Sequence, residues 1–140
     1  MKELVIDATG LIAGRLATYC AKNALRGYTV EIINIEKAVI SGNPLQIVGV
    51  YKKRRTMTNH GNPEEAAKWP RRPDFLFKKV LKGMLPNSSR GKEAARRVKA
   101  YLGETGKKAT KHDLKDSSKL RRNFITIEQL SKELGWTLNG

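Results

Sequence analysis

Short apolar runs and segments of helical periodicity alternate along the first part of the chain. Residues 4–7 (LVID) and 29–35 (TVEIINI) are apolar and rich in β-branched side chains, which predicts two strands. Between them, over residues 11–26, alanine, leucine and cysteine recur every three or four positions, which predicts a helix with one apolar face. Gly27 stands where such a helix would end. This order of elements predicts a parallel sheet with a right-handed crossover.

The next segment predicts a short strand, a second helix and a long loop. Val39-Ile40 is a candidate strand. Asn43 followed by Pro44 is typical of a helix start, because the asparagine side chain accepts from free N–H groups and proline fits the first helical position. Residues 56–73 are polar and contain several prolines, so they are expected to form an extended loop.

A third helix and a short basic helix are expected before the last strand of this region. Apolar residues return at helical spacing from Pro73, and the pattern stops within residues 83–86. Ser88 or Ser89 is suited to cap the basic helix that follows. The alternation in residues 98–102 predicts the strand.

The composition of the chain changes near its three-quarter point. At 140 residues the chain is large enough to fold without disulfides or a metal, and residues 1–103, which hold most of the periodic segments, are expected to form an α/β core domain. Residues 104–140 begin as a basic linker that is poor in apolar side chains. Near its end Thr126 and Gln129 form the pattern of a capping box, and Gly135 marks a helix stop. A small helix is therefore expected there, packed on the core or on a neighbour.

Positive charge changes this picture, because it is large and unevenly placed. The chain has 28 lysines and arginines against 13 acidic residues, a formal net charge of +15. Residues 1–50 hold 5 basic and 4 acidic residues, residues 51–122 hold 22 and 7, and residues 123–140 hold 1 and 2. A run of charge is usually only a solvated face, but a surplus confined to the middle of the chain indicates a polyanionic partner.

One segment has the position, but not the spacing, of a phosphate-binding loop. Residues 10–15 (GLIAGR) lie between a predicted strand and a predicted helix, yet they match neither GxGxxG nor GxxxxGK[ST]. A tight turn, with Gly14 as a small residue for close packing, explains them better than nucleotide binding does. The free amides at this helix start remain a candidate for accepting an RNA phosphate.

No other catalytic or metal-binding pattern stands out. His60 and His112 are isolated, and Cys20 falls on the apolar face of the first predicted helix, where a buried structural thiol is expected rather than a nucleophile. We therefore expect no enzymatic activity, cofactor, metal or small-molecule substrate. The start of the chain has no long apolar run, so we also expect no membrane span and a cytosolic location.

The basic segments suit a folded RNA better than DNA. No helix-turn-helix, zinc-finger or zipper pattern is present, and the cations are spread over loops and several predicted elements. Guanidinium groups bind phosphates in bidentate fashion, and unpaired bases stack on rings such as those of Tyr51, His60 and Trp69. For Trp69, a role as an apolar anchor under the loop is an equal alternative. Cations at the end of a helix are also favoured by its dipole, without any RNA.

Four stretches together resemble the universal large-subunit ribosomal protein L-thirteen family. They are VIDATGLIAGRLAT (5–18), INIEKAVISGNP (33–44), YKKR (51–54) and RRPDFLFKKVLKGMLPNSSRGKEAARRVKAYLG (71–103). The last contains a KGMLP turn followed by a basic helix and a strand, and in register the four stretches cover roughly residues 4–103. Beyond that point the chain departs from the bacterial form and looks like the archaeal branch, so contacts of its tail cannot be carried over from bacteria.

The resemblance implies a three-layer α/β/α fold with a mainly parallel four-stranded sheet, plus basic loops and a C-terminal helical tail. It also implies a structural protein of the cytoplasmic large ribosomal subunit that binds ribosomal RNA, contacts neighbouring ribosomal proteins and takes part early in subunit assembly. The RNA-contacting stretches of the family map onto Lys52, Lys53, Arg54, Arg55, His60, Arg71, Arg72, Lys82, Gly83, Met84, Pro86, Arg90, Lys92, Arg96 and Arg97.

Two alternatives belong to other functional classes. An RNA-binding regulator of translation outside the ribosome would share the charge and the fold, and members of the family also assume that role. Co-sedimentation with the large subunit at moderate salt distinguishes it from a ribosomal component. A degenerate nucleotide-binding enzyme is remote, and it would require saturable, magnesium-dependent binding of ATP.

Overall fold

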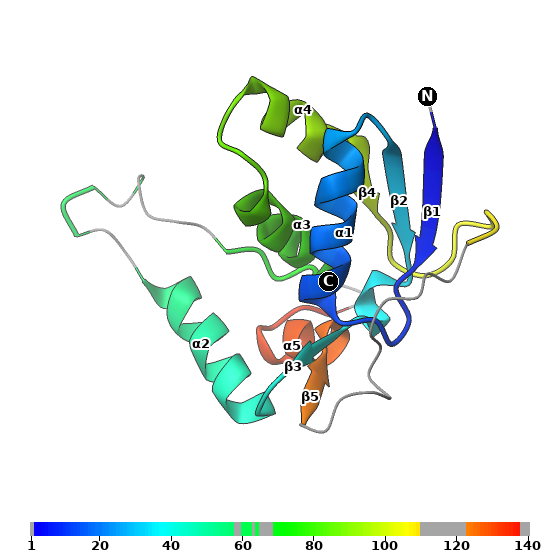
Figure 1. Ribbon diagram of the computed structural model, residues 1–140. Coiled ribbons are helices and arrows are strands. Elements are labelled where there is room, and N and C mark those ends of the chain that lie inside the picture. The colour runs from blue at the N-terminus through cyan, green and yellow to red at the C-terminus, as the bar shows by residue number, and fades with distance from the viewer. Residues whose placement is uncertain (1, 58–59, 63, 65–68, 110–122, 138–140) are drawn as a thin grey trace.

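Three parallel strands form the sheet on which the helices pack (Figure 1). The computed structural model describes residues 2–57, 60–62, 64, 69–109 and 123–137. The strands β1 (Glu3–Asp7), β2 (Thr29–Ile33) and β4 (Val98–Ala100) lie in the order β1-β2-β4, and both neighbouring pairs are parallel. The parallel arrangement predicted from the order of elements is confirmed.

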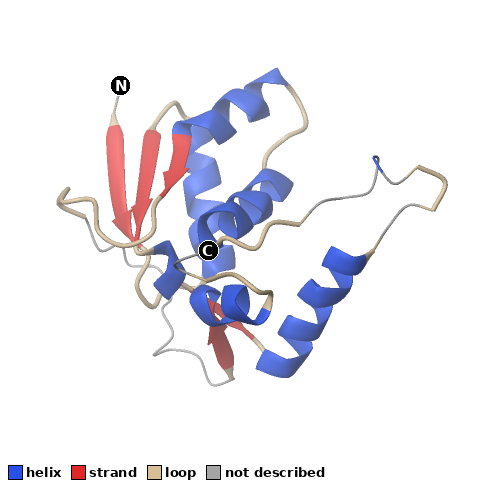
Figure 2. Ribbon diagram, turned by 180° about the vertical axis from the view of Figure 1, so that it is seen from behind, coloured by secondary structure: helices blue, strands red, loops and turns tan. Residues whose placement is uncertain are grey.

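One face of this sheet is covered by helices (Figures 1 and 2). These helices are α1 (Ala13–Leu25), α3 (Pro73–Met84) and α4 (Ser89–Arg97). The strand residues on the covered face include Ile6, Ile32 and Val98, which are almost fully buried in one apolar cluster with Leu16 and Phe77. The core therefore lies between the sheet and this helical layer, and it extends to residues near the C-terminus such as Leu130.

The described residues do not form the expected single four-stranded sheet with helices on both faces. The strand β3 (Val39–Ser41) pairs antiparallel with β5 (Phe124–Thr126) in a separate two-stranded sheet. Before β3, Asn34 adopts a left-handed conformation with φ of 55° and the 3-10 helix η1 (Ile35–Lys37) follows. The predicted strand count is therefore wrong, because this turn leads the chain away from β2 and the tail strand β5 pairs with β3.

The helices α5 (Ile127–Glu133) and α2 (Pro44–Thr56) differ in how they are supported. In α5, Ile127 and Leu130 are buried in the main apolar cluster. In α2, by contrast, no residue is buried, and Figure 1 shows the helix standing apart from the sheet and its helical layer. Ile47, Val48 and Tyr51 still pack against the core from one side of α2, so its exposed residues are the ones available for contacts with other molecules.

Helix starts and stops agree with the capping residues predicted from the sequence. Asn43 Oδ1 accepts a hydrogen bond from the Leu45 N–H group, and Ser88 Oγ accepts one from Gly91 N–H. The predicted capping box is complete, because Thr126 Oγ1 accepts from Gln129 N–H and Gln129 Oε1 accepts from Thr126 N–H. These local hydrogen bonds satisfy N–H groups that have no partner within the first turn of a helix.

Close packing at a glycine occurs at Gly91, whereas the prediction for Gly14 is wrong. Gly14 is exposed on α1, and a Cβ atom added there would have no heavy atom within 4 Å. At Gly91 the added Cβ would lie 1.8 Å from the carbonyl oxygen of Pro86. Only glycine therefore allows α4 to approach the turn after α3 this closely.

Candidate nucleic-acid interface

Two arginines of α4 fasten this helix to the end of α1. Arg97 Nη1 donates to the carbonyl oxygen of Ala24 at 2.9 Å, and Arg90 Nη2 donates to that of Leu25 at 3.4 Å. The last carbonyl groups of a helix lack partners within it, and its dipole favours cations there. The same helix leaves Lys92 and Arg96 exposed, so these two cations are presented on a support that Arg90 and Arg97 hold in place.

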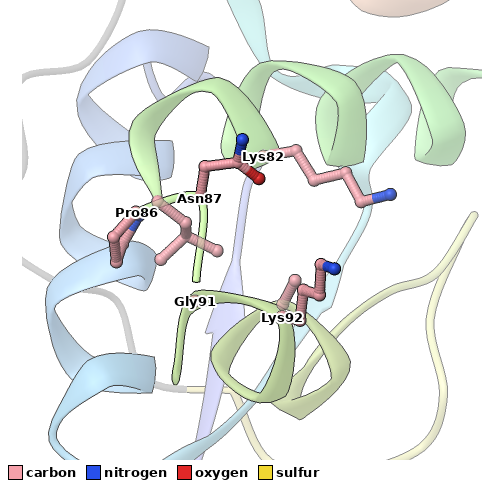
Figure 3. Close-up of a pocket in the computed structure, with 7 residues that line it drawn as sticks. Lys82, Pro86, Asn87, Gly91 and Lys92 are labelled. Atoms are coloured by element: carbon pink, nitrogen blue, oxygen red, sulfur yellow. The ribbon is translucent and has the colours of Figure 1, made fainter. Parts of the chain in front are cut away.

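A hollow of about 270 Å³ lies between the end of α3 and α4 (Figure 3). Three of the predicted contact residues, Lys82, Pro86 and Lys92, belong to its lining. The complete lining is Lys82, Leu85, Pro86, Asn87, Gly91, Lys92 and Ala95. The KGMLP turn and the basic helix that follows it therefore form one concave surface.

Trp69 is the centre of a second basic group, at the end of α2. Its ring lies edge-on to that of Tyr51, with 5.8 Å between centroids. The guanidinium of Arg54 and the ammonium of Lys79 stand 4.8 and 5.2 Å from the centroid of the indole. Arg55 donates a hydrogen bond to the carbonyl oxygen of Trp69. These contacts favour the anchoring role of Trp69 over stacking on a base, since they tie its segment to both α2 and α3.

Two positively charged residues, Arg55 and Arg71, lie near each other beside the contacts of Trp69. Burial and the nearby positive charge of Arg71 lower the pKa of Arg55 below its usual value. Arg72, by contrast, pairs with Asp74 at 3.2 Å and lies over the ring of Phe75 at 5.0 Å. An anion between Arg55 and Arg71 would relieve their repulsion, so these two residues are better suited to bind a phosphate than Arg72.

The remaining predicted contact residues have varied surroundings. His60 and Gly83 are exposed, and Met84 is 43% exposed although its sulfur accepts a hydrogen bond from Thr18 at 3.5 Å. Some exposed cations form no ion pair with any carboxylate that the structure describes. These cations are Lys52, Lys53, Lys82, Lys92 and Arg96.

The helix α3 connects the two basic groups. It supplies Lys79 to the contacts around Trp69 and Lys82 to the hollow. Lys79 was not among the predicted contact residues, although its spacing of three from Lys82 places both on neighbouring positions of a helix surface. Asn87 and Ala95 were also missed, because they carry no charge and the search for contact residues followed the cations.

The other sites considered from the sequence are a reactive cysteine, a phosphate-binding helix start, a metal site and a membrane span. Burial raises the pKa of the Cys20 thiol to about 12, which confirms a structural cysteine. Gly10 N–H donates to Lys37 and Leu11 N–H to Ala8, so the turn before α1 uses these two amides internally. The free amides at the start of α1 itself belong to Ala13, Gly14 and Arg15, and phosphate binding there stays a prediction. Within the same described residues there is no group of three or more histidines, cysteines or carboxylates placed to hold a metal, and no helix suited to cross a membrane. His112 lies outside them.

The fold and the surface define this chain as a basic α/β protein with exposed cations on α2, α3 and α4, which pair with no carboxylate among the described residues. A family model described as Ribosomal protein L13 matches residues 1–107. The chain belongs to this family.

Relatives from archaea extend the similarity beyond the matched region. The chain is 43% identical to the large ribosomal subunit protein uL13 of Methanocaldococcus jannaschii, over 94% of this chain and 96% of the relative. It is 38% identical to uL13 of Haloarcula marismortui, over 95% and 91%, and 36% identical to that of Aeropyrum pernix, over 96% and 91%. The resemblance stated from the sequence is confirmed. Membership in this family supports a structural ribosomal role, and the family is not one of enzymes.

Proposed function

We propose that this protein is a structural constituent of the cytoplasmic large ribosomal subunit, where it binds and stabilises ribosomal RNA and joins the particle early in assembly. The observation that carries this proposal is a set of exposed cations on α2, α3 and α4 that pair with no carboxylate in the described part of the chain. Cations without carboxylate partners leave the electrostatic repulsion of the fold unrelieved, and a phosphate backbone would relieve it. The names of the archaeal relatives point to the same particle.

The proposed mechanism is neutralisation of phosphates from a rigid support. Arg90 and Arg97 donate hydrogen bonds to carbonyl groups at the end of α1, and these bonds hold α4 in place. Lys92 and Arg96 on the same helix are exposed. The end of α2 presents Lys52 and Lys53 beside the contacts of Trp69. RNA helices that repel one another could then approach closely around the protein, which is how a small basic protein would favour an early folding step of a large RNA.

Sedimentation of cell extracts tests this function. We expect the tagged protein to migrate with large subunits and, after a short pulse of labelling, with their precursors. The variant Lys92→Ala with Arg96→Ala should reduce incorporation several-fold. The control variant, Lys37→Ala with Lys132→Ala, removes the same charge from exposed positions elsewhere and should incorporate normally. Arg97 is left unchanged because it contacts Ala24.

Two outcomes would contradict the proposal. If both double variants enter the subunit as well as the wild-type protein, the cations of α4 have no part in incorporation. If the wild-type protein stays in light fractions with messenger RNA and never migrates with large subunits, the regulator outside the ribosome is the better description.

A further inference from the structure

The hollow beside Pro86 combines a charged opening with an uncharged wall. Figure 3 shows Lys82 and Lys92 on opposite sides of it, with both amino groups directed toward the same open side. The side chains of Leu85, Pro86 and Ala95 supply apolar wall, and none of the lining residues is acidic. A ligand that fits these walls has an anionic end and a compact uncharged end.

The walls of the hollow are preformed. Leu85 N–H donates to the Lys82 carbonyl at 3.3 Å, and Lys92 N–H donates to the Ser88 carbonyl at 3.0 Å. Gly91 packs directly against the Pro86 carbonyl, where no Cβ atom would fit. A preformed concave surface loses little conformational entropy when a ligand enters, so contacts made inside it translate efficiently into affinity.

Size and chemistry select one kind of RNA unit. At about 270 Å³ the hollow is smaller than the roughly 300–1,000 Å³ of most pockets for whole small molecules, so it holds a single base with its sugar at most. A base inside a double helix is stacked and paired and cannot enter, whereas an unpaired base can leave its stack. The Asn87 carboxamide offers both a donor and an acceptor to a base edge.

We propose that this hollow takes one unpaired nucleotide of the large-subunit RNA, with its phosphate between Lys82 and Lys92 and its base against Leu85, Pro86 and Ala95. This inference rests on the proposed function that the protein binds this RNA. It adds a specific subsite to a surface that otherwise recognises charge and shape.

The test fills the hollow without changing the charge. The probe is a transcript of the large-subunit ribosomal RNA from the same organism, bound to full-length protein and analysed by affinity and by chemical reactivity of bases and 2′-hydroxyl groups. Ala95→Phe places a ring in the hollow, and Gln46→Phe is the control at an exposed position of α2. A second test variant, Lys82→Ala with Lys92→Ala, removes the two charges of the hollow. Its control, Lys37→Ala with Lys132→Ala, removes two charges from exposed positions elsewhere. Thermal unfolding checks that every variant folds.

We expect Ala95→Phe to weaken binding about tenfold, as for the loss of one base contact. One unpaired nucleotide that is protected in the wild-type complex should become reactive, while the rest of the footprint stays. The double lysine variant should expose the same nucleotide, which keeps the proposal testable if Ala95→Phe fails to fold. Both controls should keep the wild-type affinity and footprint.

Different results would contradict this inference and the proposed function. If the wild-type protein binds the transcript and neither variant of the hollow exposes a nucleotide, the subsite is disproved while RNA binding stands. If the wild-type protein does not bind the transcript, both proposals fall.

Discussion

At the scale of single residues, two glycines in helices show opposite surroundings. Gly91 is buried and a Cβ atom there would lie 1.8 Å from the Pro86 carbonyl oxygen, whereas Gly14 is exposed with open space around it. Helical periodicity places a glycine on a face but does not reveal which backbone of another element approaches it. This is why Gly14 could be mistaken for a close-packed residue and Gly91 overlooked.

Substituting each glycine by alanine should change stability in opposite directions. Gly91→Ala forces α4 away from the turn, so we expect the free energy of unfolding to fall by about 1–3 kcal/mol. Gly14→Ala removes backbone freedom from the unfolded chain at a helical position, so we expect it to rise by about 0.5–1 kcal/mol. Urea unfolding of both variants measures the difference, and equal stability of Gly91→Ala and wild type would refute the packing argument.

Cys20 should be unreactive in the native protein. Burial raises its pKa from an ordinary value near 9 to about 12, which lowers the thiolate fraction at pH 8 roughly a thousandfold. Because the folded state holds this proton more tightly than the unfolded state, its contribution to stability is complete below pH 9 and decreases as the pH rises toward 12.

Thiol titration and unfolding at alkaline pH check this prediction. Ellman's reagent should react with Cys20 only as fast as the protein opens, and rapidly after denaturation. Between pH 9 and 11 the stability of Cys20→Ala should depend less on pH than that of the wild type. Rapid modification of the folded protein at pH 8 would show that the thiol is accessible.

At the scale of elements, the segment after β4 is fastened to the uncovered face of the sheet. The ammonium of Lys107 lies 2.8 Å from carboxylate oxygens of both Glu3 and Glu31. The hydrogen bond and the charge of Lys107 lower the pKa of Glu3, and the same two carboxylates raise that of Lys107. This ion triplet joins residues that are more than seventy positions apart in the chain.

The attachment of this segment should depend on pH. A lowered pKa of Glu3 means that its contribution is present above the ordinary glutamate range and is lost as the pH falls through the lowered value. At neutral pH, Lys107→Ala should therefore speed amide exchange in residues 103–109, whereas the exposed neighbour variant Lys108→Ala should not. At a pH low enough to protonate Glu3, wild type and Lys107→Ala should exchange more alike, and a difference that persists there would speak against this ion triplet.

Local patterns predict elements well, and pairing between distant elements poorly. The caps at Asn43 and Thr126 act within three residues, so they are visible in the sequence. The pairing of β3 with β5 joins strands of three residues about eighty positions apart, and so short a strand has too little alternation to reveal its partner. Much of the predicted loop over residues 56–73 lies outside the described residues.

The candidate interface follows the same rule. Its basic character can be read from charge counts, and the KGMLP turn from the family resemblance. The contacts that each cation makes in the fold cannot be read from the sequence. Arg90 and Arg97 contact α1, while Lys92 and Arg96, on the same helix, stay exposed. The choice between a structural and a binding role for each cation depends on the crossing of α4 with α1, which no local pattern encodes.

At the scale of the whole molecule, RNA affinity should depend strongly on salt. If about six phosphates are contacted, affinity for duplex regions should fall roughly a thousandfold between 50 and 200 mM salt, because bound counterions are released. Lys92→Ala with Arg96→Ala should reduce the slope of log affinity against log salt by about two. Filter binding over a salt series measures the slope, and an unchanged slope in this variant would exclude the two side chains from phosphate contact.

For the free protein, added salt should raise stability, whereas it lowers the affinity for RNA. Arg55 beside Arg71, and Arg54 with Lys79 around one indole ring, store mutual repulsion in the free fold. Added ions screen that repulsion, so the isolated protein should melt at a higher temperature as salt increases, while its affinity for RNA falls. In the free protein, counterions would screen this repulsion, and in the complex the phosphates of the RNA would replace those counterions.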